Sequence, residues 1–461
     1  MKYIKLKLPL VVLFVVAVSG NVFAQGGETI TLRQAVDIAL QNNLQIKQAQ
    51  FQSAISDENL KQSKFELYPN LNSSFSANKR FGLFFDQTSG GLISGTQSTN
   101  TAGGNLSSNV NLFSGFRLQN QILQNKALLA SDKSNVEKVK NDLSLSVVNT
   151  YLQILNNQDL IKASEQQLAL SRQQLGVADK NFKVGNNTQA DLSQAQAQVA
   201  NNELSLTNAQ NAFELAMLGL KQLMEMDPQR NITLQVPVIE NLEIIESEYS
   251  GYEVYSKAVT NYPDIKVAEY NTKASEFGVK IAKGGLYPSL SFGAQLFNNY
   301  SNNAREPVFN NTGELIGQRK LSFSEQMNRN FGQAVGFNLS IPIFNNYRSR
   351  SSYNIAKIRY ENAKANEQLT KNNLNKIINQ AVQDLKSAIK SYNATQSAFN
   401  SSKDAFNAIN QRYEVGLANV IELNISQTNF NKAEFDFIQA KYNVIFRKKV
   451  IDFYLGNPLT L

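Results

Sequence analysis

Residues 182–192 read Phe-Lys-Val-Gly-Asn-Asn-Thr-Gln-Ala-Asp-Leu, and residues 413–423 read Tyr-Glu-Val-Gly-Leu-Ala-Asn-Val-Ile-Glu-Leu. Both stretches begin with an aromatic residue, carry Val-Gly at their third and fourth positions and end with an acid followed by Leu. The second stretch lies 231 residues after the first. Because spacing and residue types repeat together, the chain is interpreted as two copies of one unit.

Long helices are predicted on the N-terminal side of both stretches. The windows 70–227 and 343–457 hold none of the nine prolines, and Gly416 is the only glycine between Gly336 and Gly456. Proline breaks helices and glycine weakens them. We therefore expect helices over 116–181 and 348–412, each roughly 100 Å long at 1.5 Å per residue.

Large apolar residues recur every seven positions in these helices and in the helices that follow them. One series is Val147, Ile154, Ile161, Leu168, Leu175 and Phe182, with Ile378, Leu385, Tyr392, Phe399, Phe406 and Tyr413 in the matching places. Small residues such as Ala195, Ala209, Ala433 and Ala440 stand opposite in the returning helices. This repeat predicts left-handed coiled coils with large residues packed against small ones. An ordinary helical-bundle core is the alternative.

The returning helix of the first copy, 188–225, is shorter than its long partner and leaves part of it uncovered. A further helix predicted over 30–65 could cover the remainder. We therefore expect two shorter helices, stacked end to end, along each long helix.

Strands are predicted where residues alternate with a period of two. The segments 289–296 and 331–341 alternate bulky apolar with small or polar residues, and 71–77 and 106–112 do so more faintly. About ten residues is the length of a tilted strand that spans an outer membrane. We expect long polar loops at 81–103 and 298–330; a soluble sheet lying on the helices is the alternative.

Four strands cannot close a barrel, because single-chain barrels need at least about eight. Open sheet edges are not tolerated in lipid. The sequence therefore predicts a homotrimer whose chains share one 12-stranded transmembrane β-barrel.

Enzyme chemistry is not expected. The chain has no Cys and no His, which excludes zinc sites, thiol nucleophiles and imidazole catalysis, and no Gly-rich phosphate loop is present. No cofactor or metal is therefore predicted. The net charge of +8 comes from interspersed charges, so no nucleic-acid partner is predicted.

Residues 1–24 resemble a secretory signal peptide, with three lysines, an apolar run and a small-residue ending at Ala24. An N-terminal membrane anchor is the alternative, but the apolar run is shorter than the roughly 20 residues that a spanning helix needs. The predicted organisation after cleavage is a first repeat at 25–227, a linker or equatorial segment at 228–250, a second repeat at 251–446 and a C-terminal helix end and tail at 447–461.

The duplicated motifs, the helix-strand-strand-helix-helix order and the Tyr-Pro pairs before the strands resemble the TolC family of outer-membrane efflux proteins. The resemblance implies a mainly α fold with β: a trimeric α-helical tunnel in the periplasm below the barrel in outer-membrane lipid. It implies a passive exit duct for efflux or type I secretion, which works with an inner-membrane pump and a periplasmic adaptor protein.

The resemblance also implies roles at the hairpin tips. Val184, Gly185, Val415, Gly416 and Leu417 would contact the adaptor, although the glycines could simply be helix C-caps.

Asp191 and Glu422 would form an acidic ring at the tunnel entrance. Equally, these carboxylates could be helix N-terminal acids stabilised by the dipole. Gln194, Ile425 and Ala418 depart from the gate residues of the family.

A rival function is an exported structural coiled-coil protein of the cell envelope. The predicted strands argue against it, because a filament does not need them. A periplasmic adaptor fits less well, because adaptors carry a single hairpin within β-rich domains.

Overall fold

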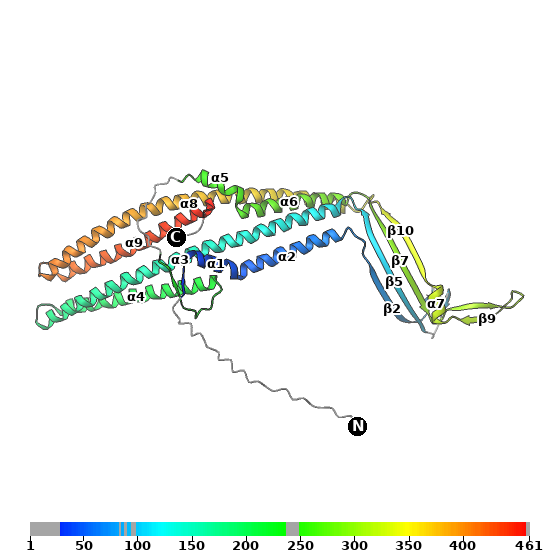
Figure 1. Ribbon diagram of the computed structural model, residues 1–461, viewed down its shortest axis with the longest axis horizontal. Coiled ribbons are helices and arrows are strands. Elements are labelled where there is room, and N and C mark those ends of the chain that lie inside the picture. Colours follow the sequence, from blue (N-terminus) through cyan, green and yellow to red (C-terminus); the bar gives the residue numbers. More distant parts are fainter. Residues whose placement is uncertain (1–27, 83, 87–89, 94–97, 237–248, 458–461) are drawn as a thin grey trace, which may run out of the picture.

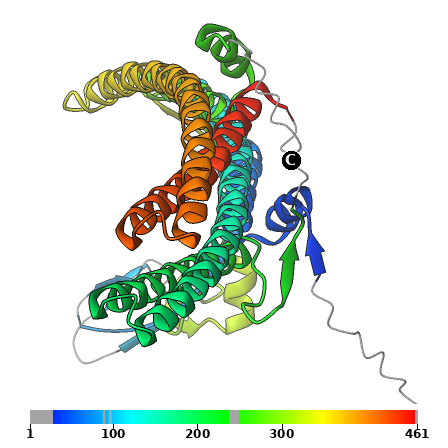
Figure 2. The same ribbon diagram turned by 90° about the vertical axis from the view of Figure 1, so that its left-hand side faces the viewer.

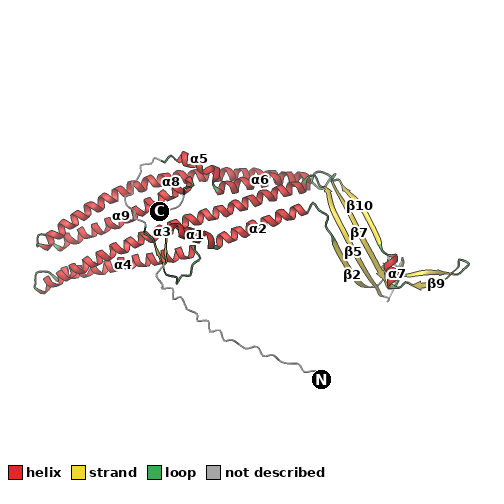
Figure 3. Ribbon diagram, in the orientation of Figure 1, coloured by secondary structure: helices red, strands yellow, loops and turns green. Residues whose placement is uncertain are grey.

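The computed structural model describes residues 28–82, 84–86, 90–93, 98–236 and 249–457. The molecule is elongated, with two helical hairpins at one end and a sheet at the other (Figures 1 and 3). The predicted signal peptide and part of the 228–250 linker lie outside the described residues.

Two helices run along most of the molecule. Helix α3 spans Arg117–Lys183 and helix α8 spans Arg348–Glu414, with 67 residues each. Each turns back into a shorter helix, α4 at Gln189–Leu223 and α9 at Val420–Leu455. The two long helices predicted from the absence of proline are confirmed, and each is roughly 100 Å long.

The packing between α8 and α9 differs from the predicted large-against-small pairing. Large aromatic residues of the two helices stack on one another: the ring centroids of Phe399 and Phe437 are 5.3 Å apart, and those of Phe406 and Phe430 are 5.5 Å apart. Planar rings can share a layer of the coil because they stack face to face with an offset. Ala433 and Ala440 are buried beside them and leave room for the rings.

The helix predicted over 30–65 is wrong as a single element. A short strand β1 at Glu28–Ile30 precedes α1 at Leu32–Asn42, and α2 then spans Leu44–Phe65. Asn43 interrupts the helix: its side-chain oxygen accepts a hydrogen bond from the Gln45 amide, and its Nδ2 donates to the Leu223 carbonyl. Asn favours caps over helix interiors for this reason.

The second repeat has the same interruption. Helices α5 at Gly251–Asn261 and α6 at Pro263–Gly284 meet at Tyr262, because Pro263 disfavours a helical conformation in the residue before it. Tyr262 stands 219 residues after Asn43, the offset that relates the two copies here.

The shorter helices stack end to end along the long ones, as predicted (Figure 1). Helices α4 and α2 both pack on α3, and α9 and α6 both pack on α8. Helix α6 also packs on α3, where Gln124 Nε2 donates to the Ala274 carbonyl at 3.0 Å. Between the interruption and the sheet, the helices therefore form a layer in the order α2, α3, α6, α8 (Figures 1 and 2).

The sheet continues this order. Its strands are β2 at Asn72–Phe81, β5 at Ser98–Phe113, β7 at Ser289–Ser301 and β10 at Gly332–Ser340. The order is β10-β7-β5-β2, and every pair is antiparallel. The four predicted strands are present, and β2 and β10 each have a neighbour on one side only.

The predicted polar loops contain secondary structure of their own, so the expectation of plain loops is wrong. The first holds β3 at Phe84–Asp86, β4 at Gly91–Ile93 and the start of β5, and the second holds the end of β7, β8 at Arg305–Phe309, β9 at Leu315–Lys320 and α7 at Phe323–Arg329.

Helix α7 is anchored by polar contacts. Ser322 and Glu325 form a capping box at its start, and Glu306 pairs with Arg319 and Arg329. Gln326, which is fully buried, exchanges two hydrogen bonds with the Ser301 backbone. These contacts hold polar residues in elements that composition alone predicts to be loops.

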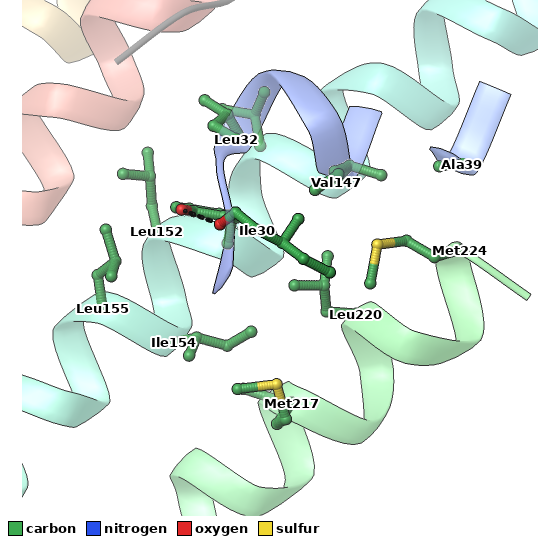
Figure 4. Close-up of a cluster of buried hydrophobic side chains, with 14 of the residues drawn as sticks. Ile30, Leu32, Ala39, Val147, Leu152, Ile154, Leu155, Met217, Leu220 and Met224 are labelled. Carbon is green, nitrogen blue, oxygen red and sulfur yellow. Dashed lines mark hydrogen bonds between the residues drawn. The ribbon is translucent and has the colours of Figure 1, made fainter. Parts of the chain in front are cut away.

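A cluster at mid-length ties the chain's beginning to the join between the repeats. Strand β1 pairs in parallel with β6 at Ile232–Leu234. Ile30 is buried among side chains of α3 and α4, including Leu152 and Leu220 (Figure 4). Tyr151 donates its hydroxyl toward the carbonyls of Ile30 and Gln235, at 3.0 and 2.8 Å. Burial raises the pKa of Tyr151 to about 12, so the hydroxyl keeps its proton.

Replacing Tyr151 with Phe removes the hydroxyl and leaves the Gln235 carbonyl without that donor. We expect the β1–β6 pair to lose about 1 kcal/mol of local stability, which makes its amides exchange about fivefold faster. Hydrogen exchange of 28–34 and 230–236 measures this. The control is Tyr252→Phe, at an exposed site in α5. Unchanged exchange in Tyr151→Phe would show that the hydroxyl does not hold the pair.

Candidate functional site

The two hairpin tips have the same backbone geometry. Gly185 has φ of +83° and Gly416 has φ of +76°. Behind each glycine a 6→1 hydrogen bond closes the turn, from the Asn186 amide to the Asn181 carbonyl and from the Leu417 amide to the Arg412 carbonyl. This is the Schellman arrangement that ends many helices. A Cβ on either glycine would meet no heavy atom within 4 Å, so the backbone angle, not space, favours glycine.

Apolar side chains project from these turns into solvent. Val184 and Val415 are each 69% exposed and Leu417 is 70% exposed. Single exposed apolar residues are common on protein surfaces, but these three residues all lie in the turns at the tips of the two hairpins. Each tip therefore has a small exposed apolar surface.

Asp191 caps its own helix. Its Oδ2 accepts hydrogen bonds from the Thr188 amide at 2.8 Å and the Thr188 hydroxyl at 2.7 Å. These bonds, the backbone one first, hold the pKa of Asp191 below its ordinary value of 3.8. The carboxylate is therefore charged at neutral pH and is also part of the α4 N-terminus.

Glu422 occupies the matching place in α9 with a looser arrangement. Its backbone amide donates a hydrogen bond to Asn419 Oδ1 at 2.8 Å, and Asn419 Nδ2 donates to Glu422 Oε1 at 3.1 Å. Arg412 Nη1 lies 4.0 Å from Glu422 Oε2, while Arg412 Nη2 donates to the Leu417 carbonyl. Glu422 is thus an exposed carboxylate with a distant cation, and the dipole role is compatible with both acids.

A cleft of about 850 Å³ lies between the tips and is lined by both repeats. The structure brings two predicted residues to its wall, Asp191 and Gly416, and leaves Val184, Gly185, Val415, Leu417 and Glu422 outside it. Other lining residues, which sequence reasoning missed, include Asn181, Asn187, Asn410, Tyr413 and Glu414. Glu414 lies within the repeated motif, but the equivalent residue of the first repeat is Lys183. The duplication therefore did not mark this position as acidic.

The first hairpin touches the second through polar contacts between α3 and α9. Gln167 Nε2 donates to Glu434 Oε2 at 2.9 Å, and the Tyr442 hydroxyl donates to Asp159 Oδ2 at 2.7 Å. Burial, and then Asp159, raises the pKa of Tyr442. Nearer the tips, Gln427 is fully buried in the chain, and neither of its amide atoms has a hydrogen-bond partner among the described residues. The seam between the hairpins is therefore held by the hydrogen bonds of Gln167 and Tyr442.

Within the described ranges no three acidic side chains are grouped so that they could hold a metal ion. Among the described helices, none is both long and apolar enough to cross a membrane.

The comparisons with known proteins agree with the geometry. Residues 35–224 and 254–457 match the family model described as outer membrane efflux protein. The chain belongs to the outer membrane efflux protein family, and the resemblance to TolC-like channels is confirmed. The family consists of channels and not of enzymes, and this chain is an outer-membrane exit duct for efflux.

Individual relatives are distant. The outer membrane efflux protein BepC of Brucella suis is 19% identical over 431 residues, which cover 93% of this chain and 86% of BepC. The pyoverdine export outer membrane protein OpmQ of Pseudomonas putida is 26% identical over 219 residues, which cover 44% of this chain and 46% of OpmQ.

Solved structures share the fold. CusC has a TM-score of 0.76 at 17% identity, with 93% of this chain and 92% of CusC covered. The CmeC outer membrane channel of Campylobacter jejuni has a TM-score of 0.76 at 19% identity, with 92% of this chain and 85% of CmeC covered.

The tip glycine gives a direct test of the turn geometry. Gly416→Ala places a Cβ at positive φ, which costs about 1 kcal/mol. We expect amides of 412–420 to exchange several-fold faster, measured by hydrogen exchange and mass spectrometry. The control is Gly176→Ala in the interior of α3, where Ala stabilises a helix by about 1 kcal/mol. Exchange of these amides that is unchanged or slower in Gly416→Ala would contradict the turn assignment.

Proposed function

We propose that three copies of this chain form one conduit, in which the sheets make a 12-stranded transmembrane barrel and the helices make a periplasmic tunnel. The observation that carries this proposal is the pair of open edges. Strand β2 and strand β10 are each hydrogen-bonded on one side only. Since unpaired backbone groups are costly in hydrocarbon, a neighbouring chain is needed at each edge.

The side chains of the edge strands support a lipid-facing surface. In β10, Val335 is 76% exposed, and Phe337 and Leu339 on the same face are also exposed. In β2, Phe75 is 86% exposed. Apolar residues on one face of a strand and small or polar ones on the other are the pattern of a membrane barrel.

Aromatic residues gather where the strands meet the helices. Exposed aromatic side chains precede β2 and β7, and others follow β5 and β10: Tyr68, Tyr287, Phe116, Phe344 and Tyr347. Aromatic girdles mark the interfaces of barrels with the membrane. This level is proposed as the periplasmic face of the outer membrane.

The helical layer has open edges too. Helix α2 exposes Phe51 and Ile55, and helix α8 exposes Ile358 and Leu369. These helices lie at the two edges of the layer, and they are continued by β2 and β10 in the sheet (Figure 1). Packing α8 of one protomer on α2 of the next would bury both apolar rows and close the tunnel.

The tips are proposed to receive a periplasmic adaptor protein. Val184, Gly185, Val415, Gly416 and Leu417 would contact it, because a hydrogen bond closes each turn and the apolar side chains are exposed. An inner-membrane pump would then deliver cargo into the tunnel. The relatives include proteins named for pyoverdine export and for toxin and drug export, which suggests small molecules or polypeptides as cargo.

Asp191 and Glu422 are proposed as an acidic ring at the entrance. Three protomers would bring their carboxylates around one opening, where negative charge attracts cations. Hydrogen bonds already keep Asp191 ionised, and Glu422 has only a distant cation. Capping and ring formation are compatible, because both use the charged form.

The chain organisation is proposed as a signal peptide at 1–24, repeats at 25–227 and 251–446, an equatorial segment at 228–250 and a tail at 447–461. Cleavage after Ala24 would release the mature chain into the periplasm before insertion.

Native mass spectrometry of the purified protein in detergent tests the assembly. We expect a species of three times the mature chain mass, because each open edge requires a neighbour. Monomers alone, under conditions that keep the circular dichroism of the helices, would refute the trimer.

Conductance across planar bilayers tests the ring. Glu422→Gln removes one ring carboxylate per protomer, so cation selectivity and block by multivalent cations should both fall. Glu214→Gln, an exposed acid in the middle of α4, is the control and should leave both unchanged. If cation selectivity and block in Glu422→Gln equal those of the wild type, the acidic ring is contradicted, but the proposed trimer is not.

A further inference from the structure

Cations recur every seven residues on three neighbouring helices, in the part of the molecule between the mid-length cluster and the sheet. Helix α3 carries Lys126, Lys133 and Lys140; helix α6 carries Lys266, Lys273 and Lys280; helix α8 carries Arg350, Lys357, Lys364 and Lys371. In a coiled coil, residues seven apart stay on one face. Each helix therefore bears one continuous basic row, and the three rows together are called the basic wall.

The side of the helical layer that the basic wall faces can be found from the residue seven positions after the last cation of a row. On α3 that residue is Val147, which is fully buried in the cluster that contains Leu32 of α1. On α8 it is Ile378, which is fully buried in the cluster that contains Val254 of α5, a helix that packs on α8. Helices α1 and α5 lie on the convex side of the curved helical layer (Figure 2). The rows on α3 and α8 therefore face outward, away from the concave side.

The row on α6 shares this face. Lys266 and Lys273 flank Tyr270 by four and three residues, and Tyr270 lines a groove together with Lys133. The groove has a volume of about 570 Å³, and Gln50 and Ser53 of α2 form its other wall. A concave surface thus adjoins the basic wall at Lys133.

The positive charge of the wall is only partly neutralised. Glu137, Glu276 and Glu361 pair with Lys140, Lys280 and Lys364, and Glu269 lies 3.7 Å from both Lys266 and Lys371. Glu367 also pairs with Lys371.

Five cations of the wall are exposed and have no ion pair within 4.0 Å among the described residues: Lys126, Lys133, Lys273, Arg350 and Lys357. On the tip side of the cluster the charges nearly balance, since residues 148–223 and 379–455 together carry 14 Lys and Arg against 13 Asp and Glu. The excess of cations is therefore concentrated between the cluster and the sheet.

The distance of the basic wall from the membrane decides which anions can reach it. Lys126, Lys133 and Lys140 lie roughly 14, 24 and 35 Å along α3 from its start at Arg117. The polar layer of a membrane extends only roughly 5–8 Å beyond the hydrocarbon. Phospholipid headgroups could reach Arg350 and Lys280, which lie close to the sheet ends of α8 and α6, but not the other cations of these rows, so the partner must lie in the periplasm.

We propose that the basic wall binds a carboxylate-bearing polymer of the periplasm, of the class to which cell-wall peptidoglycan belongs. Rows of cations roughly 10 Å apart along the helix give overlapping fields at a physiological Debye length of about 8 Å. A polymer with repeated carboxylates can engage several rows at once, so weak single contacts act together. The wall anchors the conduit where it crosses the cell wall. The outward direction rests on the proposed trimer.

The test measures retention of purified full-length trimers in detergent on washed peptidoglycan sacculi. The variant is the triple substitution Lys126→Gln, Lys133→Gln and Lys273→Gln. The control is Lys180→Gln, Lys386→Gln and Lys390→Gln, which removes the same charge from exposed positions below the cluster.

We expect retention of the wild type and the control to differ by less than about twofold, and retention of the wall variant to fall at least about tenfold. Added salt should release the wild type. Equal retention of both variants, or no retention of the wild type, would overturn the proposal, as would equal wall-dependent binding to anionic lipid vesicles.

Native mass of each sample separates the two proposals. Intact trimers that are not retained overturn the basic wall alone, whereas monomers overturn the trimer.

Discussion

A strand in hydrocarbon needs a hydrogen-bonded neighbour on both sides, and the rest of the molecule depends on this constraint. The four-stranded sheet meets it at β5 and β7 and leaves it unmet at β2 and β10. The helices continue the strands in the same order, so the open edges extend from the sheet into the helical layer. One chain is thus a segment of a conduit, and three segments complete it in our proposal.

The two repeats share their main structural features. Both repeats interrupt the helix before the sheet, at Asn43 and at Tyr262, although by different chemistry. Both tips close with glycine at positive φ. The mid-length cluster then joins the repeats, since β1 from the beginning of the chain pairs with β6 from the join. The two hairpins remain separate below it, apart from the polar seam between α3 and α9.

The long helices could be predicted because proline, the residue that interrupts helices most strongly, is absent over many residues. The interruption at Asn43 could not, because Asn is tolerated inside helices and its decisive partner, the Leu223 carbonyl, is 180 residues away. The small elements in the predicted loops were missed for a similar reason: α7 depends on Ser301, Glu306 and other distant contacts.

At the tips, the repeated motif predicted the turns and both acids but not the cleft between them. The cleft and the seam arise from contacts between residues more than 200 positions apart, such as Gln167 with Glu434. A seven-residue repeat defines which face of a helix is buried in its own hairpin, and it carries no information on how one hairpin meets another. Tyr442 and Asp159 therefore had no signal in the sequence pattern.

Disulfide formation between β2 and β10 tests the open-edge account most directly, because the chain has no native cysteine. One cysteine would replace Ser76 in β2, and a second would be moved along β10 from Gly336 to Ser340. Within one chain these strands are separated by two others, roughly 14 Å, which is beyond the reach of a disulfide. The account predicts covalent dimers and trimers in outer membranes, at positions that share a face of the barrel. Monomers at every position, with cysteines that remain free or bond within one chain, would contradict it.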